Sequence, residues 1–421
     1  MKILHVSNGG VPILSKTGGG TEKYILDLAR CQAQLGNDVT VVDRKRGMGE
    51  NEVQVLEGIW FVRTPVPELK FKLGRVRLPL GLSYRLASVI DSLLFGMFVA
   101  LRLDLDAFDV LHFHDVFVLL PVVILKRTAR HRSVFTQHGV SFQLDTSLLW
   151  FYQTIRIFVI RRVAAVIALN PVARSQFEAE TQGSCVLVRF IPAGVKPVEI
   201  HPLSFGNDLK DSRNLKEQIV LFVGRITNQK GVEVLIEAAE ILIQQRGKKN
   251  LTFVIVGPNE QFDASVEQTL YSYKLSKMIK EFGLEGHVHL TGRISGEALE
   301  RFFTICDIFV LPSYFETFPR VVLEAMSFGK PVIASRLPGT LMQIRNGYNG
   351  YLVRPGDIID LADKIELLLD NPNLINTMGQ NGFSTIKQRF DVSVVAREVL
   401  ETYREVITRA SDHVGNCRTI R

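Results

Sequence analysis

The sequence predicts an α/β protein of two domains, each built around a parallel β-sheet. Its 421 residues, 46% of them hydrophobic and 22% charged, are too many for one hydrophobic core and suit two. Apolar strand patterns alternate with helical patterns from residue 2 onward, and the alternation begins again at residue 219 after a polar stretch. In sheets of this kind, ligand sites are expected at the carboxyl ends of the strands.

The first forty residues predict a β-α-β unit with a glycine-rich first turn. An apolar strand at 2–7 leads into a loop with glycines at 18–20, and a helix follows at 21–35 with Thr21 as its N-cap. The next strand is expected at 39–42. The glycine-rich turn would let a ligand approach the backbone closely. Its spacing differs from the dinucleotide-binding fingerprint, so it gives little support for a nicotinamide cofactor.

Polar side chains end two further predicted strands, at 109–115 and 134–139. Because the carboxyl ends of parallel strands face the ligand crevice, four of these residues are candidates for it: His112, His114, Asp115 and His138. The His-x-His-Asp pattern also suggests a metal site. We expect the alternation of side chains along the strand to turn one histidine away, and we predict no metal here.

A second α/β series follows the polar stretch at 201–216, which we interpret as a linker. Its first strand, at 219–223, leads into a loop in which Arg225 and Lys230 flank the start of the next helix. Two cations beside the unpaired N–H groups of a helix N-terminus predict a phosphate-binding site. Surface salt bridges are the alternative, which we favour less because both cations lie at the same predicted sheet edge as Glu316.

Two glutamates are eight residues apart across a predicted loop-to-helix junction. An apolar run at 308–311 predicts a buried strand, and Pro319 suits the first turn of the helix that follows. Glu316 is therefore expected in the loop and Glu324 on the helix. The helix N-terminus would attract a diphosphate, and the carboxylates would accept hydrogen bonds from sugar hydroxyls. The alternative is an exposed ion pair between Glu324 and Arg320.

The formal net charge of +7 lies entirely in the N-terminal half, where residues 1–190 carry 23 Lys and Arg against 16 Asp and Glu. The densest basic runs, at 70–77 and 126–132, are interleaved with apolar residues. They predict contact with anionic lipid headgroups, with a solvated basic face as the alternative. No aromatic-interleaved groove or nucleic-acid motif accompanies them, so no nucleic-acid partner is predicted.

Cysteine usage and the N-terminus predict a cytoplasmic protein, which the basic runs could hold peripherally on the inner face of the membrane. The four cysteines lack the spacing of metal ligands or of a disulfide framework. The opening segment is too short for the apolar region of a signal peptide. Charged residues interrupt the two most apolar stretches, at 86–101 and 148–169, so these are predicted to be core segments.

Five motifs make the sequence resemble the retaining glycosyltransferases of family 4, the glycogen-synthase-like group with the GT-B fold. They occur in the family's order along nearly the whole chain: Thr-x-His-Gly at 136–139, Ile-Pro-x-Gly-Val at 191–195, Gly-Arg-x4-Lys-Gly at 224–231, Glu-x7-Glu at 316–324 and Gly-Lys-Pro-Val-Ile-Ala at 329–334. The resemblance implies two Rossmann-like, doubly wound domains that face each other across a cleft.

The resemblance also implies domain boundaries and site residues. The expected parts are an acceptor-binding domain at 1–197, a linker at 198–216, a donor-binding domain at 217–389, a helix at 390–410 that crosses back to the first domain, and a tail at 411–421. The catalytic set is His138, Glu316, Arg225 and Lys230. The donor-binding set is Gly18, Gly19, Gly20, Arg225, Lys230, Gly257, Ile294, Glu316, Thr317, Phe318 and Glu324. In these sets the cations would hold the diphosphate, the first glutamate the sugar and the second the ribose.

The implied reaction moves a sugar from a UDP- or GDP-linked donor to an acceptor hydroxyl with retention at the anomeric carbon, in glycan, glycolipid or cell-surface polysaccharide synthesis. The acceptor would be a glycan, a lipid-linked molecule or a small molecule. No metal is expected, because two cations can stabilise the departing diphosphate. The alternatives are a sugar-nucleotide epimerase of the same fold and a non-catalytic nucleotide-sugar-binding protein. Many relatives carry glycine where Thr317 and Pro319 stand, so a backbone N–H contact from position 319 is not available here.

Overall fold

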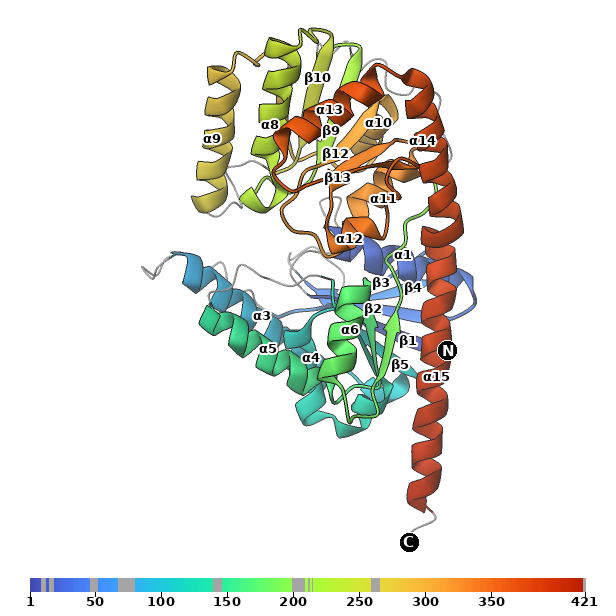
Figure 1. Ribbon diagram of the computed structural model, residues 1–421. Coiled ribbons are helices and arrows are strands. Elements are labelled where there is room, and N and C mark those ends of the chain that lie inside the picture. Colours follow the sequence, from blue (N-terminus) through green and yellow to red (C-terminus); the bar gives the residue numbers. More distant parts are fainter. Residues whose placement is uncertain are drawn as a thin grey trace. The chain divides into compact units, whose positions relative to one another are not determined.

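The computed structural model describes two compact units (Figure 1). The first unit is Met1–Gly194 with Val392–Arg421, and the second is Val195–Asp391. The described residues are 1–8, 13–14, 19–45, 52–66, 80–138, 146–198, 209–210, 213, 215–258 and 266–418. Gly18, the basic run at 70–77 and most of the predicted linker at 198–216 therefore lie outside them.

The first unit contains an eight-stranded sheet in the order β3-β4-β2-β1-β5-β6-β7-β8. Neighbouring strands are parallel except for the antiparallel pair β3 and β4, which the sequence analysis did not predict. The strands are β1 (Lys2–Val6), β2 (Asp38–Arg44), β3 (Val53–Leu56), β4 (Ile59–Thr64), β5 (Val110–Phe113), β6 (Ser133–Thr136), β7 (Ala165–Ala168) and β8 (Leu187–Phe190). The parallel strands are short and apolar because helices cover both faces of the sheet.

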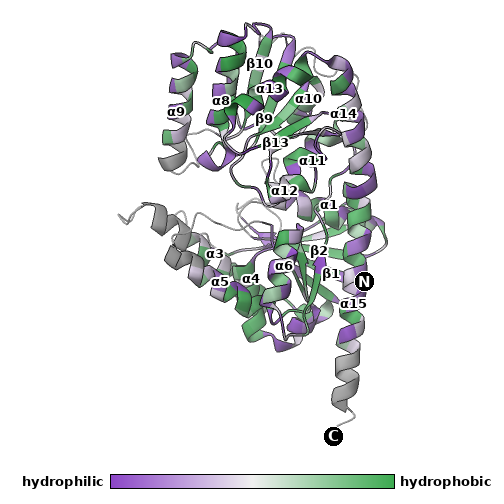
Figure 2. Ribbon diagram, viewed as in Figure 1, coloured by the Kyte–Doolittle hydropathy of each residue, from purple (hydrophilic) through white to green (hydrophobic). Residues whose placement is uncertain are grey.

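Two groups of helices cover that sheet (Figure 1). On one face α1 packs against α15, and on the other α4 packs against both α3 and α5. The helices are α1 (Gly20–Gln34), α3 (Leu80–Arg102), α4 (Val116–Leu125), α5 (Thr146–Ile160), α6 (Pro171–Glu180) and α15 (Val392–Arg418). Helix α4 is apolar on every side, as Figure 2 shows, because the sheet and its two neighbours bury most of it. Among the described helices, none has the length and apolar character that a bilayer span requires.

The second unit contains a six-stranded parallel sheet in the order β11-β10-β9-β12-β13-β14. This is the Rossmann order, and it reverses between β9 and β12. The strands are β9 (Gln218–Val223), β10 (Leu251–Val256), β11 (Val288–Gly292), β12 (Ile308–Leu311), β13 (Val332–Ser335) and β14 (Gly350–Val353). The predicted fold class of two doubly wound parallel-sheet domains is confirmed.

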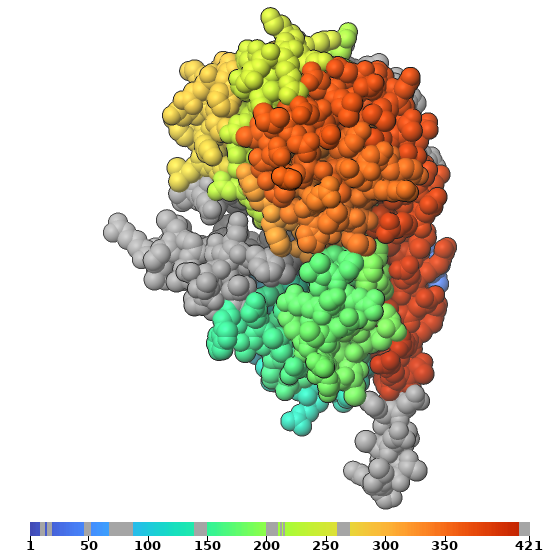
Figure 3. Space-filling model, viewed as in Figure 1, coloured from blue at the N-terminus to red at the C-terminus, as the bar shows by residue number. Residues whose placement is uncertain are grey.

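The helices of the second unit cover both faces of its sheet. They are α8 (Val232–Glu240), α9 (Val266–Glu281), α10 (Glu297–Ile305), α11 (Arg320–Ser327), α12 (Pro338–Leu341), α13 (Ile358–Leu369) and α14 (Pro372–Thr385). Helices α13 and α14, in orange tones, form much of the surface of this unit that Figure 3 shows.

The C-terminal helix differs from the prediction at its far end. We expected it at 390–410 with a tail at 411–421, but α15 runs from Val392 to Arg418. No proline interrupts residues 411–418, so the backbone hydrogen bonds continue. The chain leaves the first unit after Gly194 and returns to it at Val392. These two residues lie together, since a Cβ on Gly194 would be 2.8 Å from the Cα of Val392.

Candidate functional site

The loops after β9 and β12 meet in the second unit, because these strands are neighbours where the sheet order reverses. The backbone N–H of Tyr314 donates to the carbonyl of Gln229 at 2.9 Å, and the Gln229 side-chain amide donates to the carbonyl of Phe315 at 2.9 Å. Gly231 has φ +61°, and a Cβ there would lie 2.2 Å from the carbonyl oxygen of Pro312. Only glycine fits at this contact.

An ion pair occupies the junction of these two loops. Lys230 Nζ lies 2.5 Å from Glu316 Oε1, and the two side chains are 14% and 8% exposed. The Ser313 hydroxyl donates to the same carboxylate oxygen at 2.9 Å. The sequence placed both charged residues at this sheet edge but did not predict that they pair. The Arg225 side chain is exposed, and it makes no hydrogen bond or ion pair with any of the described residues.

Helix α11 carries the second glutamate and differs in detail from the prediction. It begins at Arg320, so Pro319 is its N-cap and lies outside the first turn. Glu324 is half-buried on the helix, while Phe318 and Arg320 are 8% and 9% exposed. The alternative placed Glu324 and Arg320 on an exposed helix face, but Arg320 is buried in the structure, so that face is not an exposed one.

The Thr317–Phe318 peptide is held by the start of α12. A Cβ on Gly339 would lie 2.5 Å from the carbonyl oxygen of Thr317 and 3.0 Å from the backbone nitrogen of Phe318. This close approach fixes the peptide whose N–H groups the sequence placed on the donor. Any side chain at position 339 would displace it.

Glycines end three neighbouring strands of the second sheet. Gly224, Gly257 and Gly292 follow or close β9, β10 and β11, and the N–H of Gly257 donates to the carbonyl of Gly292 at 3.0 Å. A Cβ on Gly257 would lie 1.9 Å from the carbonyl oxygen of Gly224. Packing alone therefore requires glycine at 257, and the same bare backbone would let a ligand approach this edge of the sheet.

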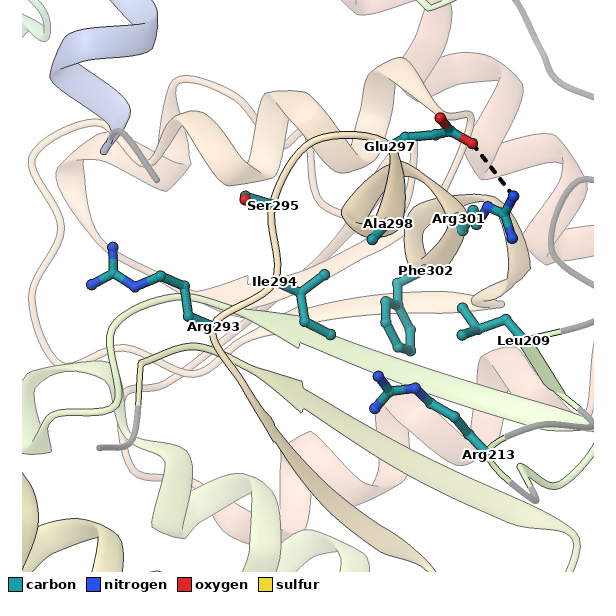
Figure 4. A pocket seen from close by; sticks show the side chains of 9 residues that line it. All are labelled: Leu209, Arg213, Arg293, Ile294, Ser295, Glu297, Ala298, Arg301 and Phe302. Carbon is teal, nitrogen blue, oxygen red and sulfur yellow. Dashed lines mark hydrogen bonds and ion pairs between the residues drawn. The ribbon is translucent and has the colours of Figure 1, made fainter. Parts of the chain in front are cut away.

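Ile294 lies in a cavity of ≈ 590 Å³ beside β11 and α10 (Figure 4). Its side chain points toward Phe302 there, and Arg213 stacks on that ring at 5.5 Å from the centroid. The cavity is lined by Leu209, Arg213, Arg293, Ile294, Ser295, Glu297, Ala298, Arg301 and Phe302. Neither member of the Lys230–Glu316 ion pair lines it, so the structure does not place Ile294 in one pocket with that pair.

The start of α1 forms a second group of predicted residues, in the first unit. The helix begins at Gly20 with Gly19 as N-cap, so the prediction of Thr21 as N-cap is wrong. The Glu22 carboxylate, in the first turn, accepts a hydrogen bond from the backbone N–H of Gly19, and burial raises the pKa of its carboxyl. Asn8, after β1, donates to it at 3.3 Å.

Histidines gather in the first unit where its sheet order reverses, between β1 and β5. His5 and His112 are register partners on these strands, and the ring centroids of His112 and His114 are 4.2 Å apart. Our expectation that alternation would separate the last two was wrong, since residues i and i+2 of a strand share a face. Burial lowers the pKa of His5 to about 4 and holds the pKa values of His112 and His114 well below the usual value.

Three neutral imidazoles are a plausible donor set for a transition metal. Each of their six ring nitrogens, however, already has a partner within the protein. His112 contacts the Tyr403 hydroxyl at 2.6 Å and the Thr136 hydroxyl at 2.7 Å, and the nitrogens of His5 and His114 are equally engaged. Hydrogen bonding accounts for this buried cluster without an ion.

His138 is half-buried at the end of β6, next to this cluster. Its Nε2 lies 2.8 Å from His114 Nδ1, and the ring of Tyr24 packs on it at 4.7 Å between centroids. Sequence reasoning selected His138 and His114 but missed the residues behind them: His5, Gln32 and Tyr403. The signal in the sequence was a polar residue at a position expected to be buried: His5 in the apolar first strand and Gln32 on the helix that follows it.

Family models match two segments of the chain. The model described as glycosyl transferase 4-like domain matches residues 19–194, and the model for glycosyl transferases group 1 matches residues 207–385. The α-D-kanosaminyltransferase of Streptomyces kanamyceticus is 30% identical over 262 residues, which are 59% of this chain and 62% of that protein. A Campylobacter jejuni N,N'-diacetylbacillosaminyl-diphospho-undecaprenol α-1,3-N-acetylgalactosaminyltransferase is 34% identical over 194 residues, 46% of each chain. These matches span less than two thirds of either relative.

Solved structures of the same fold cover the chain more fully. Sucrose-phosphate synthase from Thermosynechococcus elongatus has a TM-score of 0.76 at 22% identity, over 97% of this chain and 99% of that one. Anabaena HepE in complex with UDP and glucose has a TM-score of 0.70 at 22% identity, over 96% and 100% of the two chains. At this level of identity, the likeness shows a common fold.

Proposed function

Because the chain belongs to glycosyltransferase family 4 and has the GT-B fold, we propose that it transfers a sugar from a UDP- or GDP-linked donor to an acceptor hydroxyl, with retention of the anomeric configuration. The observation that carries the proposal is the Lys230–Glu316 ion pair at the switch point of the second sheet. A cation and a carboxylate held together there suit a ligand that has an anionic diphosphate next to sugar hydroxyls.

Each residue of this group has a task in the proposed reaction. Lys230 and Arg225 stabilise the negative charge that develops on the departing diphosphate, while Glu316 accepts hydrogen bonds from the sugar. The bond from the anomeric carbon to the phosphate oxygen breaks, and the acceptor oxygen bonds to the same face of that carbon. The acceptor proton passes to the departing phosphate. This scheme uses no metal ion.

The proposal includes the class of partner. The acceptor is a glycan, a lipid-linked molecule or a small molecule, and the reaction belongs to glycan, glycolipid or polysaccharide synthesis. The Campylobacter jejuni relative, whose name includes a diphospho-undecaprenol acceptor, supports a lipid-linked acceptor. UDP is the first nucleotide to test, because a protein of the same fold has been solved with it.

We expect one nucleoside diphosphate to raise the melting temperature in excess EDTA. UDP, GDP and ADP are compared by thermal shift on the parent chain and on Lys230→Met. At 100 times its Kd, the selected nucleotide stabilises the fold by about 2.7 kcal/mol. Lys230→Met should lose most of this shift, whereas Lys249→Met, a surface control in the same unit, should keep it.

Turnover with the selected nucleotide's sugars then separates the alternatives. Release of nucleoside diphosphate that depends on an acceptor supports the transferase. Interconversion of free sugar nucleotides without an acceptor would indicate the epimerase, and binding without turnover on any acceptor would indicate a binding protein. Activity that EDTA abolishes and only Mg²⁺ or Mn²⁺ restores would contradict the metal-independent scheme.

We also propose that the first unit binds an anionic membrane surface. Ile124 and Leu125, at the end of α4, are 51% and 46% exposed and precede Lys126 and the exposed Arg127. Apolar side chains beside cations suit the headgroup region of an anionic bilayer. The basic run at 126–132 is only partly available, because Arg130 donates to the carbonyl of Val123 at 2.7 Å. Arg132 likewise donates to the carbonyl of Phe108, at 2.6 Å.

Sedimentation with liposomes tests this surface. Vesicles with 30% phosphatidylserine should retain the chain at low salt and release it at high salt, because screening weakens the attraction. Ile124→Ser with Arg127→Ser should reduce the retained fraction, and Leu270→Ser, an exposed apolar residue of the second unit, should not. Equal recovery on neutral phosphatidylcholine vesicles would show that no anionic surface is recognised.

A further inference from the structure

A chain of side chains runs from Gln32 to His138 within the first unit. Gln32 Oε1 lies 2.7 Å from His5 Nε2, His5 Nδ1 lies 3.1 Å from His114 Nε2, and His114 Nδ1 lies 2.8 Å from His138 Nε2. The first three residues are 0%, 0% and 5% exposed. Because they are shielded from water, each contact must be a hydrogen bond with one donor and one acceptor.

The glutamine at the buried end sets the direction of every donor. A carbonyl oxygen only accepts, so His5 must carry its proton on Nε2 and accept at Nδ1. His114 must then donate from Nε2 and accept at Nδ1. His138 must in turn donate from Nε2, which leaves Nδ1 as its acceptor nitrogen. The opposite orientation of the Gln32 amide would reverse the whole chain.

We propose that Gln32, His5 and His114 are positioning residues that fix His138 as the neutral tautomer with its proton on Nε2. Nδ1 is then an acceptor nitrogen, so a hydrogen bond between it and a substrate hydroxyl would have to be donated by that hydroxyl. The location of His138 beside the reacting centre rests on the proposed function. The tautomer itself follows from these contacts together with the orientation of the Gln32 amide, and it is independent of the proposed function.

The surroundings keep this chain neutral. Burial lowers the pKa of His5 to about 4 and that of His114 well below the usual value. A protonated imidazole has no acceptor nitrogen and would break the chain. Three other titratable rings contact these residues: Tyr24 packs on His114, His112 packs on His5, and the Tyr403 hydroxyl interacts with the Gln32 side chain. Burial lowers the pKa of His112 and raises that of Tyr403, so these two are neutral as well.

A residue on helix α1 therefore determines which ring nitrogen of His138 is the hydrogen-bond acceptor at the proposed reacting centre. Gln32 belongs to α1, and it acts on His138 only through the two buried histidines. The chain also anchors the His138 ring, because the imidazole cannot rotate without losing its bond to His114. A change at position 32 should alter turnover while it leaves nucleotide binding by the second unit intact.

Ring nitrogen NMR of the full chain labelled with 15N-histidine tests the proposal. The His138 signals are assigned by comparison with His138→Gln. We expect the parent protein to show protonated Nε2 and unprotonated Nδ1 at His138, His114 and His5 at pH 8. A proton on Nδ1 of His138, or fast exchange between the two tautomers, would overturn the proposal without reference to any activity.

Three variants distinguish an effect of these hydrogen bonds on the His138 tautomer from a general effect on packing. Gln32→Met removes the acceptor at nearly constant volume and should mix the His138 tautomers. Gln32→Glu keeps an acceptor oxygen and should preserve the parent tautomer. Thr136→Val is the matched control, because it removes a buried hydroxyl from His112, which is not a member of this series of hydrogen bonds. It should leave the His138 signals unchanged.

Kinetics with the donor found in the nucleotide panel supply the second readout. Gln32→Met should lower kcat at least about 10-fold, the scale of a misplaced catalytic group, with the nucleotide Kd unchanged. Gln32→Glu should recover kcat. Equal losses in Gln32→Met and Thr136→Val, or no recovery in Gln32→Glu, would show that the residues serve stability alone. A parent chain without turnover but with the expected tautomer would count against the proposed function only.

Discussion

Glu316→Gln is expected to lower kcat and kcat/KM about 10- to 150-fold, which corresponds to the 1.5 to 3 kcal/mol of a hydrogen bond to a charged group. The carboxylate contacts tighten as the anomeric carbon gains positive charge, so their loss acts on the transition state. Glutamine keeps an oxygen for Lys230 and Ser313, which hold Glu316 in the structure. Affinity for the bare nucleoside diphosphate should therefore stay within about twofold.

Glu324→Ala is the matched comparison and should show the reverse pattern. If this half-buried carboxylate on α11 holds the ribose, its loss weakens binding of the bare nucleotide by about 1.5 to 3 kcal/mol. Calorimetry with UDP and steady-state kinetics on both variants provide the two measurements. If both variants bind and turn over like the parent protein, the assignment of this glutamate pair fails.

The first unit is expected to lose about 5 kcal/mol of its free energy of unfolding between pH 6.5 and pH 5. His5, His112 and His114 have lowered pKa values in the folded state because they are buried. Below pH 6.5 the unfolded chain takes up protons there and the folded chain does not, so each histidine costs about 1.4 kcal/mol per pH unit. Stability is full above pH 6.5 and falls as the pH falls toward 4. The raised pKa of Glu22 opposes this loss in part.

Urea unfolding followed by tryptophan fluorescence isolates this effect. Both tryptophans, Trp60 and Trp150, belong to the first unit, so the signal reports the part of the chain that holds the histidines. His5→Gln should reduce the pH dependence by about a third. His131→Gln, at an exposed position, is the control and should leave it unchanged. A parent protein equally stable at pH 7.5 and pH 5 would refute the argument.

The sequence by itself determined most strands of the two sheets, the loops that follow them and the charged residues those loops carry, but it did not predict β3, β4 or β14. Apolar runs such as 308–311 are strands because their period and flanking glycines leave few alternatives, and β12 has those limits. The sequence placed Lys230 and Glu316 in loops that follow strands and Glu324 on the helix after the second loop, and α11 carries Glu324 as expected. Helix starts were less predictable. Glu22 is the third residue of α1, and its carboxylate accepts a hydrogen bond from the backbone N–H of Gly19, so the helix begins after Gly19 and Thr21 lies inside it.

Only the tertiary structure decided which of these groups touch. Lys230 and Glu316 pair because β9 and β12 are neighbours, and strand adjacency is not encoded in any local pattern. The histidine cluster joins β1, β5 and β6 to α1 and α15, and its contact between His112 and Tyr403 links residues 291 positions apart. A period or a motif describes what one segment prefers. The hydrogen-bond partner of a buried polar group depends on which distant segment packing brings to it.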